Sequence, residues 1–447
     1  MTTTFYQLNS SEDGNPQIAK GAFGTIKIAV CKSQHKHTEK GPLQTYSYVA
    51  LKTIHNALCP SREPFNSTNN KPQLTPSVFA ELAALRVLSS DGHKHDNITP
   101  LLSILSSSKS SFDLHDITFV FPHCPIDLYQ IILSHRFDTS KTETNLPIPV
   151  IRVALMDILN GLKHIHTVGI MHCDMKPSNI LLSSKGTFQL ADFGLARLIL
   201  PKRANDEDLD EEESPSQAIT GLCTLPYRPP EILFGSEDYQ PSVDMWGVGL
   251  ILCEMLSGRA LFYGINVLDT LSRIISVLGT PNYDNWEGLE NLRDHGKISF
   301  EQTKGIGLAN VVNILEDDIW LKQLVESTVV MDPTKRCTPS EGLEHEWMQG
   351  VRMSRKDICR NFVPKAFCSD YDGYTYQANG NDGDEKMELF LLQQMKLWGA
   401  EIASAKRDFS STYGASQGQK GNCRVDVQVS DEVTGLLSAH MNANKGA

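Results

Sequence analysis

The sequence lacks the features that mark several large classes of protein. Its apolar runs all fall short of the roughly 20 residues that a membrane-spanning helix needs, and its polar start does not resemble a secretory signal. The 10 cysteines are scattered without the paired spacing of metal sites, which is typical of free thiols. A formal net charge of −12 gives little attraction for nucleic-acid phosphates. We therefore expect a soluble protein without membrane or nucleic-acid partners.

Apolar patterns predict both strands and helices. Glycine and β-branched residues are frequent in residues 18–54, which favours a small antiparallel sheet. A buried helical stripe is predicted by Ile151, Ala154, Leu155, Ile158, Leu162 and Ile165. With 447 residues, of which 40% are hydrophobic, the chain is long enough to bury a large core in two lobes. These patterns predict an α+β fold.

The most informative segment is residues 172–179, which read His-Cys-Asp-Met-Lys-Pro-Ser-Asn, followed by Ala-Asp-Phe-Gly at 191–194. A polar turn alone would collect similar residues, but the downstream Asp-Phe-Gly favours a shared site. The two segments resemble the catalytic loop and the metal-binding segment of protein kinases. The resemblance implies that Asp174 accepts the proton of a substrate hydroxyl and that Lys176 lies near the γ-phosphate of ATP.

The chemistry of phosphoryl transfer explains why these residue types recur together. The transferred group needs little covalent help but much positioning, and its oxygens are clamped by divalent cations and a lysine. Hard oxygen ligands suit Mg²⁺, so the resemblance assigns the metal to Asn179 and Asp192. The implied cofactors are ATP and Mg²⁺.

A nucleotide site is indicated by residues 18–26, which resemble the glycine-rich loop of protein kinases. Ala19 replaces the first of three expected glycines, and the other two remain where backbone approaches phosphate oxygens. We expect Glu81 to orient Lys52 toward the α- and β-phosphates. The resemblance implies that the nucleotide is bound by Ile18, Gly21, Gly24, Ile26, Ala50, Lys52, Glu81, Phe121, Cys124 and Leu181.

Three later segments extend the resemblance, at residues 227–231, 244–249 and 332–336. They resemble the end of the activation segment, the buried central helix and the late arginine motif of protein kinases. We expect Glu231 and Arg336 to pair and to hold the larger lobe together, which is a structural role.

The resemblance implies a bilobal protein kinase fold in which the small, mainly β lobe runs to about residue 122 and the larger, mainly α lobe follows. The expected parts are an N-terminal extension at 1–13, the kinase domain at 14–348, inserts at about 56–77 and 201–218, and a C-terminal extension at 349–447. The acidic run at 205–213 is interpreted as a solvated insertion, with a phosphate substitute or an attractant for a basic substrate as alternatives. Apolar residues at near-helical intervals in 385–409 predict one helix, which either docks on the large lobe or holds a partner.

A narrower resemblance is to the cyclin-dependent kinases and their relatives. It is carried by a Leu-Gly-Thr-Pro insert at 278–281 and by Arg228 in the closing segment. It implies serine/threonine specificity and a protein substrate. Phe121 would be the gatekeeper, and residues 122–124 would be the hinge, where Cys124 supplies a backbone donor and an acceptor to adenine.

Departures from that family concern its switches. Cyclin-dependent kinases usually gather three arginines around a phosphothreonine of the activation loop, but the aligned residues are Ala80, Cys173 and Arg197. The aligned phosphosite is Ile219. Because a dianionic phosphate needs several charge-assisted contacts to order a loop, we expect this switch to be missing.

Two more controls are missing from the sequence. Ala22 and Phe23 replace the threonine and tyrosine that carry inhibitory phosphates in many cyclin-dependent kinases, and residues 76–77 lie one residue out of register with the cyclin-binding helix signature. A kinase without these controls resembles the fungal cyclin-dependent-kinase-activating kinases, which are monomers that phosphorylate the activation loop of other kinases. The resemblance implies such a substrate, no obligate cyclin, and a place in the cytoplasm or nucleus.

Two other functions remain open at this point. A cyclin-dependent or other proline-directed kinase with an unusual loop would share the same motifs. A pseudokinase scaffold is suggested by Ala19, Cys173 and Pro226, which replace family residues. Against the scaffold, every group expected to touch phosphate, metal or the transferred proton is retained.

Overall fold

The protein is described by a computed structural model. The structure describes residues 3–7, 17–20, 24–38, 41–55, 58–59, 73–90, 92–107, 116–136, 146–199, 223–237, 239–297, 300–364 and 376–379. Gly21, the acidic run at 205–213, most of the insert at 56–77 and the predicted helix at 385–409 therefore lie outside the described residues.

The chain divides into two compact units. The first comprises residues 1–78, 100–125 and 359–447, and the second comprises 79–99 and 126–358. The sequence placed the end of the small lobe near residue 122; the division between units falls after Pro125 and assigns residues 79–99 to the second unit. No helix among the described residues is long and apolar enough to cross a lipid bilayer.

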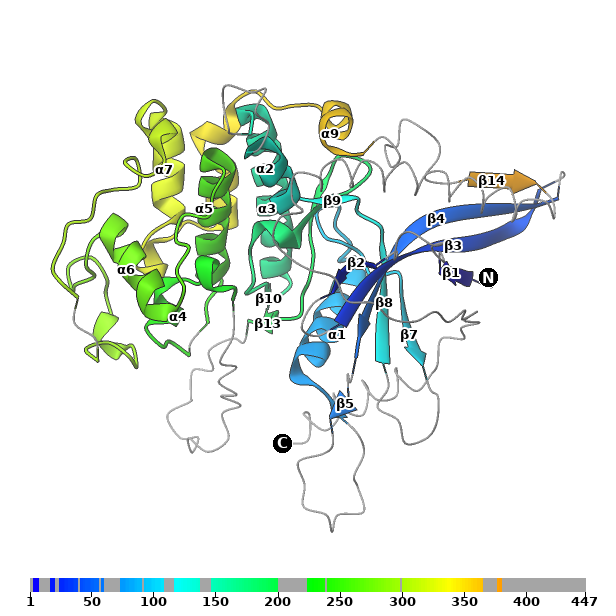
Figure 1. The fold of residues 1–447 in the computed structure, drawn as a ribbon, viewed down its shortest axis with the longest axis horizontal. Coiled ribbons are helices and arrows are strands. Elements are labelled where there is room, and N and C mark those ends of the chain that lie inside the picture. The colour runs from blue at the N-terminus through cyan, green and yellow to red at the C-terminus, as the bar shows by residue number, and fades with distance from the viewer. Residues whose placement is uncertain are drawn as a thin grey trace, which may run out of the picture. The chain divides into compact units, whose positions relative to one another are not determined.

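The first unit is built on one antiparallel sheet, as predicted for residues 18–54. Five strands run in the order β1-β3-β4-β8-β7, β2 pairs with β3, and β14 pairs with β4 (Figure 1). Their bounds are Thr3–Gln7 (β1), Gln17–Lys20 (β2), Gly24–Thr38 (β3), Gly41–Ile54 (β4), Ser103–Ser107 (β7), Asp116–Pro122 (β8) and Tyr376–Asn379 (β14). Ala29, Cys31, Val49 and Val120 form a buried apolar cluster on the sheet. A separate small hairpin pairs β5 (Leu58–Cys59) with β6 (Gln73–Leu74).

The second unit is mainly helical, and its longest helices are α3 and α5 (Figure 1). Its α-helices are α1 (Pro76–Ser89, all but its first turn), α2 (Leu128–Arg136), α3 (Ile148–Thr167), α4 (Pro230–Leu233), α5 (Ser242–Ser257), α6 (Val267–Leu278), α7 (Ile319–Thr328), α8 (Pro339–Glu344) and the start of α9 (Arg355–Phe362). All six residues of the stripe predicted in α3 are buried, which confirms that prediction.

Short strands and 3₁₀ turns of the second unit place the polar motifs. One antiparallel sheet has the order β12-β11-β9, and a second pairs β10 with β13. The strands are β9 (Ile126–Asp127), β10 (Ile170–Met171), β11 (Ile180–Leu182), β12 (Phe188–Leu190) and β13 (Arg197–Leu198). The 3₁₀ turns are η1 (Pro177–Asn179), η3 (Leu225–Tyr227), η4 (Leu289–Asn291), η5 (Asn313–Glu316), η6 (Pro333–Lys335) and η7 (Glu346–Gln349).

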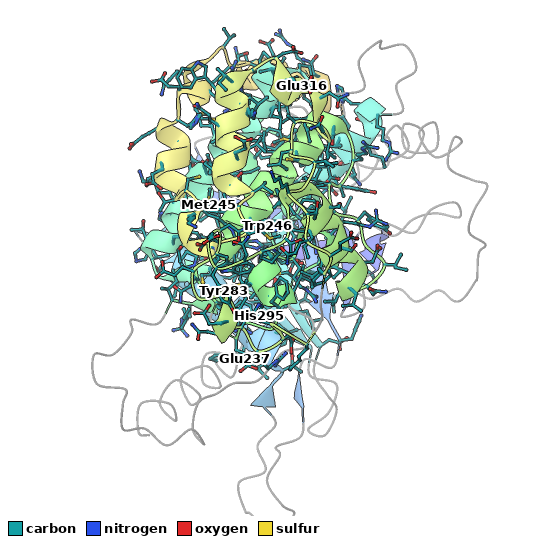
Figure 2. All side chains as sticks on the ribbon, turned by 90° about the vertical axis from the view of Figure 1, so that its left-hand side faces the viewer. Glu237, Met245, Trp246, Tyr283, His295 and Glu316 are labelled. Carbon is teal, nitrogen blue, oxygen red and sulfur yellow. The ribbon has the colours of Figure 1, made fainter. Side chains whose placement is uncertain are left out.

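Helix α5 is the structural centre of the second unit. It is apolar around most of its circumference, and every residue from Val243 to Leu256 is buried. Trp246 stacks on Phe262 with ring centroids 5.9 Å apart. In Figure 2, Met245 and Trp246 lie between Glu316 at the top of the view and the group of Tyr283, His295 and Glu237 near the bottom.

Candidate functional site

The polar run at 172–179 is held by the buried carboxylate of Asp244, at the start of α5. Its Oδ2 accepts hydrogen bonds from the backbone N–H of His172 at 2.9 Å and from His166 Nε2 at 2.8 Å, and its Oδ1 accepts from the N–H of Cys173 at 2.8 Å. Burial alone would raise the pKa of Asp244, but these donors outweigh it and keep the pKa below its ordinary value. Cys173 has a φ of 63°, a left-handed conformation that these two N–H bonds support.

The Asp174 side chain is the centre of the candidate site. Both of its carboxylate oxygens accept hydrogen bonds: Oδ2 from Lys176 Nζ at 2.6 Å and Asn179 Nδ2 at 3.0 Å, Oδ1 from the N–H and Oγ1 of Thr224 at 3.0 and 2.9 Å. Lys176 Nζ also donates to Thr224 Oγ1 at 2.8 Å. The structure therefore brings the predicted base, lysine and asparagine together and fixes the carboxylate in one orientation.

Thr224 belongs to the candidate site, and the sequence analysis did not single it out. Its hydroxyl and its backbone N–H both contact Asp174, from a segment 50 residues away in the chain. Its place three residues before Tyr227, in a segment that resembles the end of the activation segment, was the signal that could have identified it.

The two predicted metal ligands lie in adjacent segments. The backbone N–H of Ala191 donates to Asn179 O at 2.9 Å, and Asp192 follows with a φ of 64° and an exposed side chain. The Asn179 amide nitrogen is used by Asp174 O and Oδ2, so its side-chain oxygen is the atom that suits a cation. One amide oxygen and one carboxylate are hard ligands of the kind that Mg²⁺ takes. These residues fit the predicted metal.

A histidine connects residues 172–179, the predicted catalytic run, to the Asp-Phe-Gly segment at 192–194. His172 Nε2 donates to Ala191 O at 3.0 Å, while its Nδ1 accepts from the N–H of Asp174 at 3.3 Å. Its ring lies 5.0 Å from the ring of Phe193, between centroids. His172 therefore links the segment that carries Asp174 to the segment that carries Asp192.

Glu81 lies on α1 and is 2% exposed. A Cβ atom placed on Gly194 would lie 3.7 Å from Glu81 Oε2 and 3.4 Å from Asp192 Oδ1, so the two carboxylates flank the same glycine. Leu181, a predicted nucleotide contact, lies on β11 opposite Gln189 of β12 and Asp127 of β9. The second unit therefore contains Glu81, Leu181 and all four residues predicted for catalysis and metal binding.

Most of the other predicted nucleotide contacts lie on neighbouring strands of the first unit. Lys52 on β4 faces Ile26 of β3, and Ala50 pairs with Phe121 of β8. After β8, the N–H of His123 donates to Tyr48 O at 3.3 Å. This bond fastens the predicted hinge, including Cys124, to the edge of β4.

The two ends of the glycine-rich loop lie on β2 and β3. Ile18 lies on β2, which pairs with β3, and Gly24 begins β3. A Cβ atom on Gly24 would lie 2.1 Å from Thr53 O, so only glycine permits this approach of β3 to β4. The nucleotide-binding roles of these residues remain predictions.

An apolar cluster surrounds Cys173, one of the positions where the sequence predicted that the arginines of a phosphate pocket are missing. Met171 and Cys173 are buried, and Leu195, Ile199 and Tyr239 pack against them. Burial raises the pKa of the Cys173 thiol well above its ordinary value. The guanidinium of Arg197 lies 3.8 Å from the centre of the Tyr239 ring. Cys173 is thus a packed apolar side chain, and Arg197 makes a cation–π contact at the edge of the cluster.

The residue before Thr224 has an unusual backbone. Cys223 has a φ of 61°, and its carbonyl accepts from Arg228 Nη2 at 2.9 Å. Its thiol donates to Cys173 O at 2.5 Å. The end of the activation segment is therefore bonded to both residues 173 and 174 of the catalytic run.

The predicted pair of Glu231 and Arg336 is confirmed. Arg336 Nη1 and Nη2 donate to the two oxygens of Glu231 at 2.7 and 2.6 Å, and both residues are buried. Arg336 also donates to the carbonyls of Val330, Ser242 and Met331. A bidentate pair with its remaining donors satisfied is the arrangement in which a buried charge is tolerated.

Known proteins share this sequence pattern. The family described as the protein kinase domain matches residues 17–348. Cyclin-dependent kinase E-1 of Arabidopsis thaliana is 31% identical over 352 residues, which cover 74% of this chain and 65% of that protein. Cyclin-dependent kinase G1 of the same plant is 32% identical over 259 residues, which cover 56% of this chain and 39% of that protein. The chain thus spans less than two thirds of the length of either relative.

Proposed function

Because the chain belongs to the protein kinase family, as a cyclin-dependent-kinase-like serine/threonine kinase, we propose that it phosphorylates the activation loop of other cyclin-dependent kinases and needs no phosphate on its own activation loop. Membership of the family implies ATP and a divalent metal, and the oxygen ligands Asn179 and Asp192 support Mg²⁺ as that metal.

The apolar cluster around Cys173 is the observation that carries this proposal. A phosphorylated activation loop is ordered when several arginines grip its phosphate. At the aligned positions this chain has Ala80, a Cys173 packed among apolar side chains, and an Arg197 stacked on Tyr239. A phosphate dianion beside Cys173 would lose its hydration to apolar neighbours, which is unfavourable. These contacts support a kinase whose activation segment is ordered without that switch.

The activation segment has another anchor. Thr224 and Cys223 bind Asp174 and Cys173 directly, and Arg228 holds the Cys223 carbonyl. In kinases that are activated by phosphorylation, the loop phosphate makes this connection. In this chain, neutral groups and one guanidinium make it instead. They support a monomer that is competent without a cyclin. We place it in the cytoplasm or nucleus as part of the same proposal.

The test uses full-length protein made in bacteria and treated with a phosphatase. We expect it to phosphorylate a purified cyclin-dependent kinase on its activation-loop threonine without added cyclin. A target in which that threonine is alanine is the matched control for the site, and Asp174→Asn is the inactive control for the enzyme. Equal incorporation by wild type and Asp174→Asn would favour the pseudokinase scaffold, and silence until a cyclin is added would contradict the proposal.

One observation favours the second candidate, a proline-directed kinase. Cys223 has a left-handed backbone conformation, and its carbonyl accepts a hydrogen bond from Arg228. This carbonyl is therefore not available to accept an N–H of the substrate. A substrate proline has no N–H and would lose nothing there. A peptide library scanned at the residue after the acceptor serine or threonine separates the two. Strong selection of proline would favour this second function.

A further inference from the structure

We propose that His95 and His164 are positioning residues that clasp α1, and with it Glu81, to the second unit, and that the clasp opens when His95 takes up a proton. The two imidazole rings are stacked, with centroids 4.9 Å apart and planes inclined by 24°. His164 Nε2 donates to His93 O at 2.8 Å, and His95 Nδ1 accepts the backbone N–H of Asn97 at 3.2 Å. One histidine from α3 therefore holds the loop that follows α1.

The same loop is fastened to the strand that leads to the metal ligand. Asn97 Nδ2 donates to Phe188 O at 3.0 Å, Asn97 O accepts from the N–H of Leu190 at 2.8 Å, and the N–H of Thr99 donates to Leu190 O at 2.9 Å. Leu190 ends β12, two residues before Asp192. Because α1 ends at Ser89, only a few residues separate this clasp from the helix that carries Glu81. A displacement of the loop therefore reaches Glu81 and Asp192 together.

Charged groups around His95 make the clasp sensitive to protons. Burial and the neighbouring His164 lower the pKa of His95, whereas Asp96 and Asp157 raise it. His93 lies 6.3 Å from the His164 ring, between centroids. At neutral pH the His95 ring is therefore neutral and its Nδ1 is an acceptor. Protonation removes this acceptor and places a positive charge against the second imidazole.

A residue beyond the matched kinase domain tunes this charge. Arg355, on α9, donates to both oxygens of the buried Asp157 at 2.6 Å and to Gly186 O at 3.0 Å. Asp157 Oδ2 also accepts from the N–H of Phe188, on β12. Because Arg355 neutralises Asp157, it weakens the one buried carboxylate that favours a protonated His95. Arg355, which follows residue 348, thus shifts the pH at which the clasp opens.

The test measures hydrogen exchange of residues 76–99 in the full chain between pH 5.5 and 7.5, after correction for the intrinsic pH dependence of exchange. We expect the protection factors of wild type to fall roughly three- to tenfold toward pH 5.5, because protonation of His95 removes the acceptor of the Asn97 N–H and one hydrogen bond is worth about that much. His164→Phe keeps a ring in the stack but removes the imidazole that opposes a charge on His95, together with the bond to His93 O. Its protection should therefore be lower than that of wild type at pH 7.5, and its further loss toward pH 5.5 several-fold smaller. Arg355→Gln should shift the loss to higher pH, and Arg355→Lys, which keeps the charge but not the bidentate pair, should shift it less.

Turnover supplies the second readout, which rests on the kinase activity proposed above. The ratio of kcat at pH 6 to kcat at pH 7.5 should be lower in wild type than in His164→Phe, with KM for ATP changing less than kcat. Identical exchange profiles in wild type, His164→Phe and Arg355→Gln would overturn the clasp, whatever the substrate. Normal exchange results without turnover would instead count against the proposed function.

Discussion

At the scale of single residues, the candidate site is centred on one carboxylate, Asp174, both of whose oxygens accept hydrogen bonds. Asp174 receives hydrogen bonds from Lys176, Asn179 and Thr224, and this fixes the oxygen that would meet a substrate hydroxyl. A carboxylate held by three neighbours has a fixed orientation, so the predicted base is oriented before a substrate arrives.

Thr224→Val tests this anchoring. It removes the hydroxyl that donates to Asp174 Oδ1 and accepts from Lys176. We expect kcat to fall roughly tenfold to a hundredfold, the scale of one lost orienting contact, with KM for ATP little changed. Thr224→Ser keeps the hydroxyl and should retain most of kcat. Steady-state kinetics decide the matter, and equal turnover of Thr224→Val and Thr224→Ser would show that the hydroxyl does not orient the base.

Cys173→Arg tests the apolar nature of the neighbouring cluster. The new guanidinium would be buried against Met171, Leu195 and Tyr239, beside Arg197. An uncompensated buried charge costs on the order of 3–5 kcal/mol of unfolding free energy. Cys173→Ala should cost much less, because it removes only one small group. Urea unfolding measures both variants. A stable Cys173→Arg protein that is activated by a phosphate would mean that the pocket is a dormant phosphate site.

At the scale of elements, α5 is the platform on which the catalytic run rests. Asp244 at its start binds two backbone N–H groups of the run, and Arg336 lies 5.1 Å from the ring of Trp246 while pairing with Glu231. The helix therefore connects the base to the end of the activation segment. A change in how closely the run approaches α5 should alter the position of Asp174.

Gly247→Ala tests that approach. A Cβ at this position would lie 2.6 Å from Met175 Cβ and 3.0 Å from Met175 O, next to Asp174. Replacing a helical glycine by alanine normally stabilises a helix by about 1 kcal/mol, so the clash decides the sign. We expect a lower melting temperature and a kcat reduced at least tenfold, the scale of a catalytic group moved by about 1 Å.

Gly342→Ala on α8 is the matched control. A Cβ there would meet the flexible end of Leu159 at 3.2 Å, which can yield. Its melting temperature and kcat should stay near those of wild type. If Gly247→Ala behaved like this control, the catalytic run would not depend on its contact with α5.

At the scale of the whole molecule, the sequence predicted what depends on local pattern or on the family resemblance. The stripe of α3 and the sheet around β3 and β4 were predicted from local pattern, and the pairing of Glu231 with Arg336 was predicted from the resemblance; all three are confirmed. The hydrogen bonds of Thr224 to Asp174 and the pairing of β14 with β4 were not, because their partners are distant in the chain and no local period reports them. At Cys173 the sequence predicted only that an arginine charge is missing. It did not predict the apolar packing, because tertiary neighbours decide which side chains take the place of that charge.

His123 is one source of pH-dependent stability. Burial lowers the pKa of His123 to about 4, whereas an unfolded histidine titrates near 6.5. Between these values only the unfolded chain binds the proton, so the free energy of unfolding is fully retained above pH 6.5 and decreases as the pH falls toward 4. From pH 7 to pH 5 this residue alone should account for about 2 kcal/mol. In urea titrations, His123→Gln should lose less stability over that interval; a parallel loss in both proteins would assign the effect elsewhere.

The most direct measurement of the central claim compares kcat for one preparation in two states: fully dephosphorylated, verified by mass spectrometry, and exposed to upstream kinases with ATP. An activation segment anchored by Thr224, Cys223 and Arg228 predicts a kcat ratio near 1 between the two states. A dephosphorylated protein at least tenfold slower, restored by phosphate on its activation segment, would contradict the account.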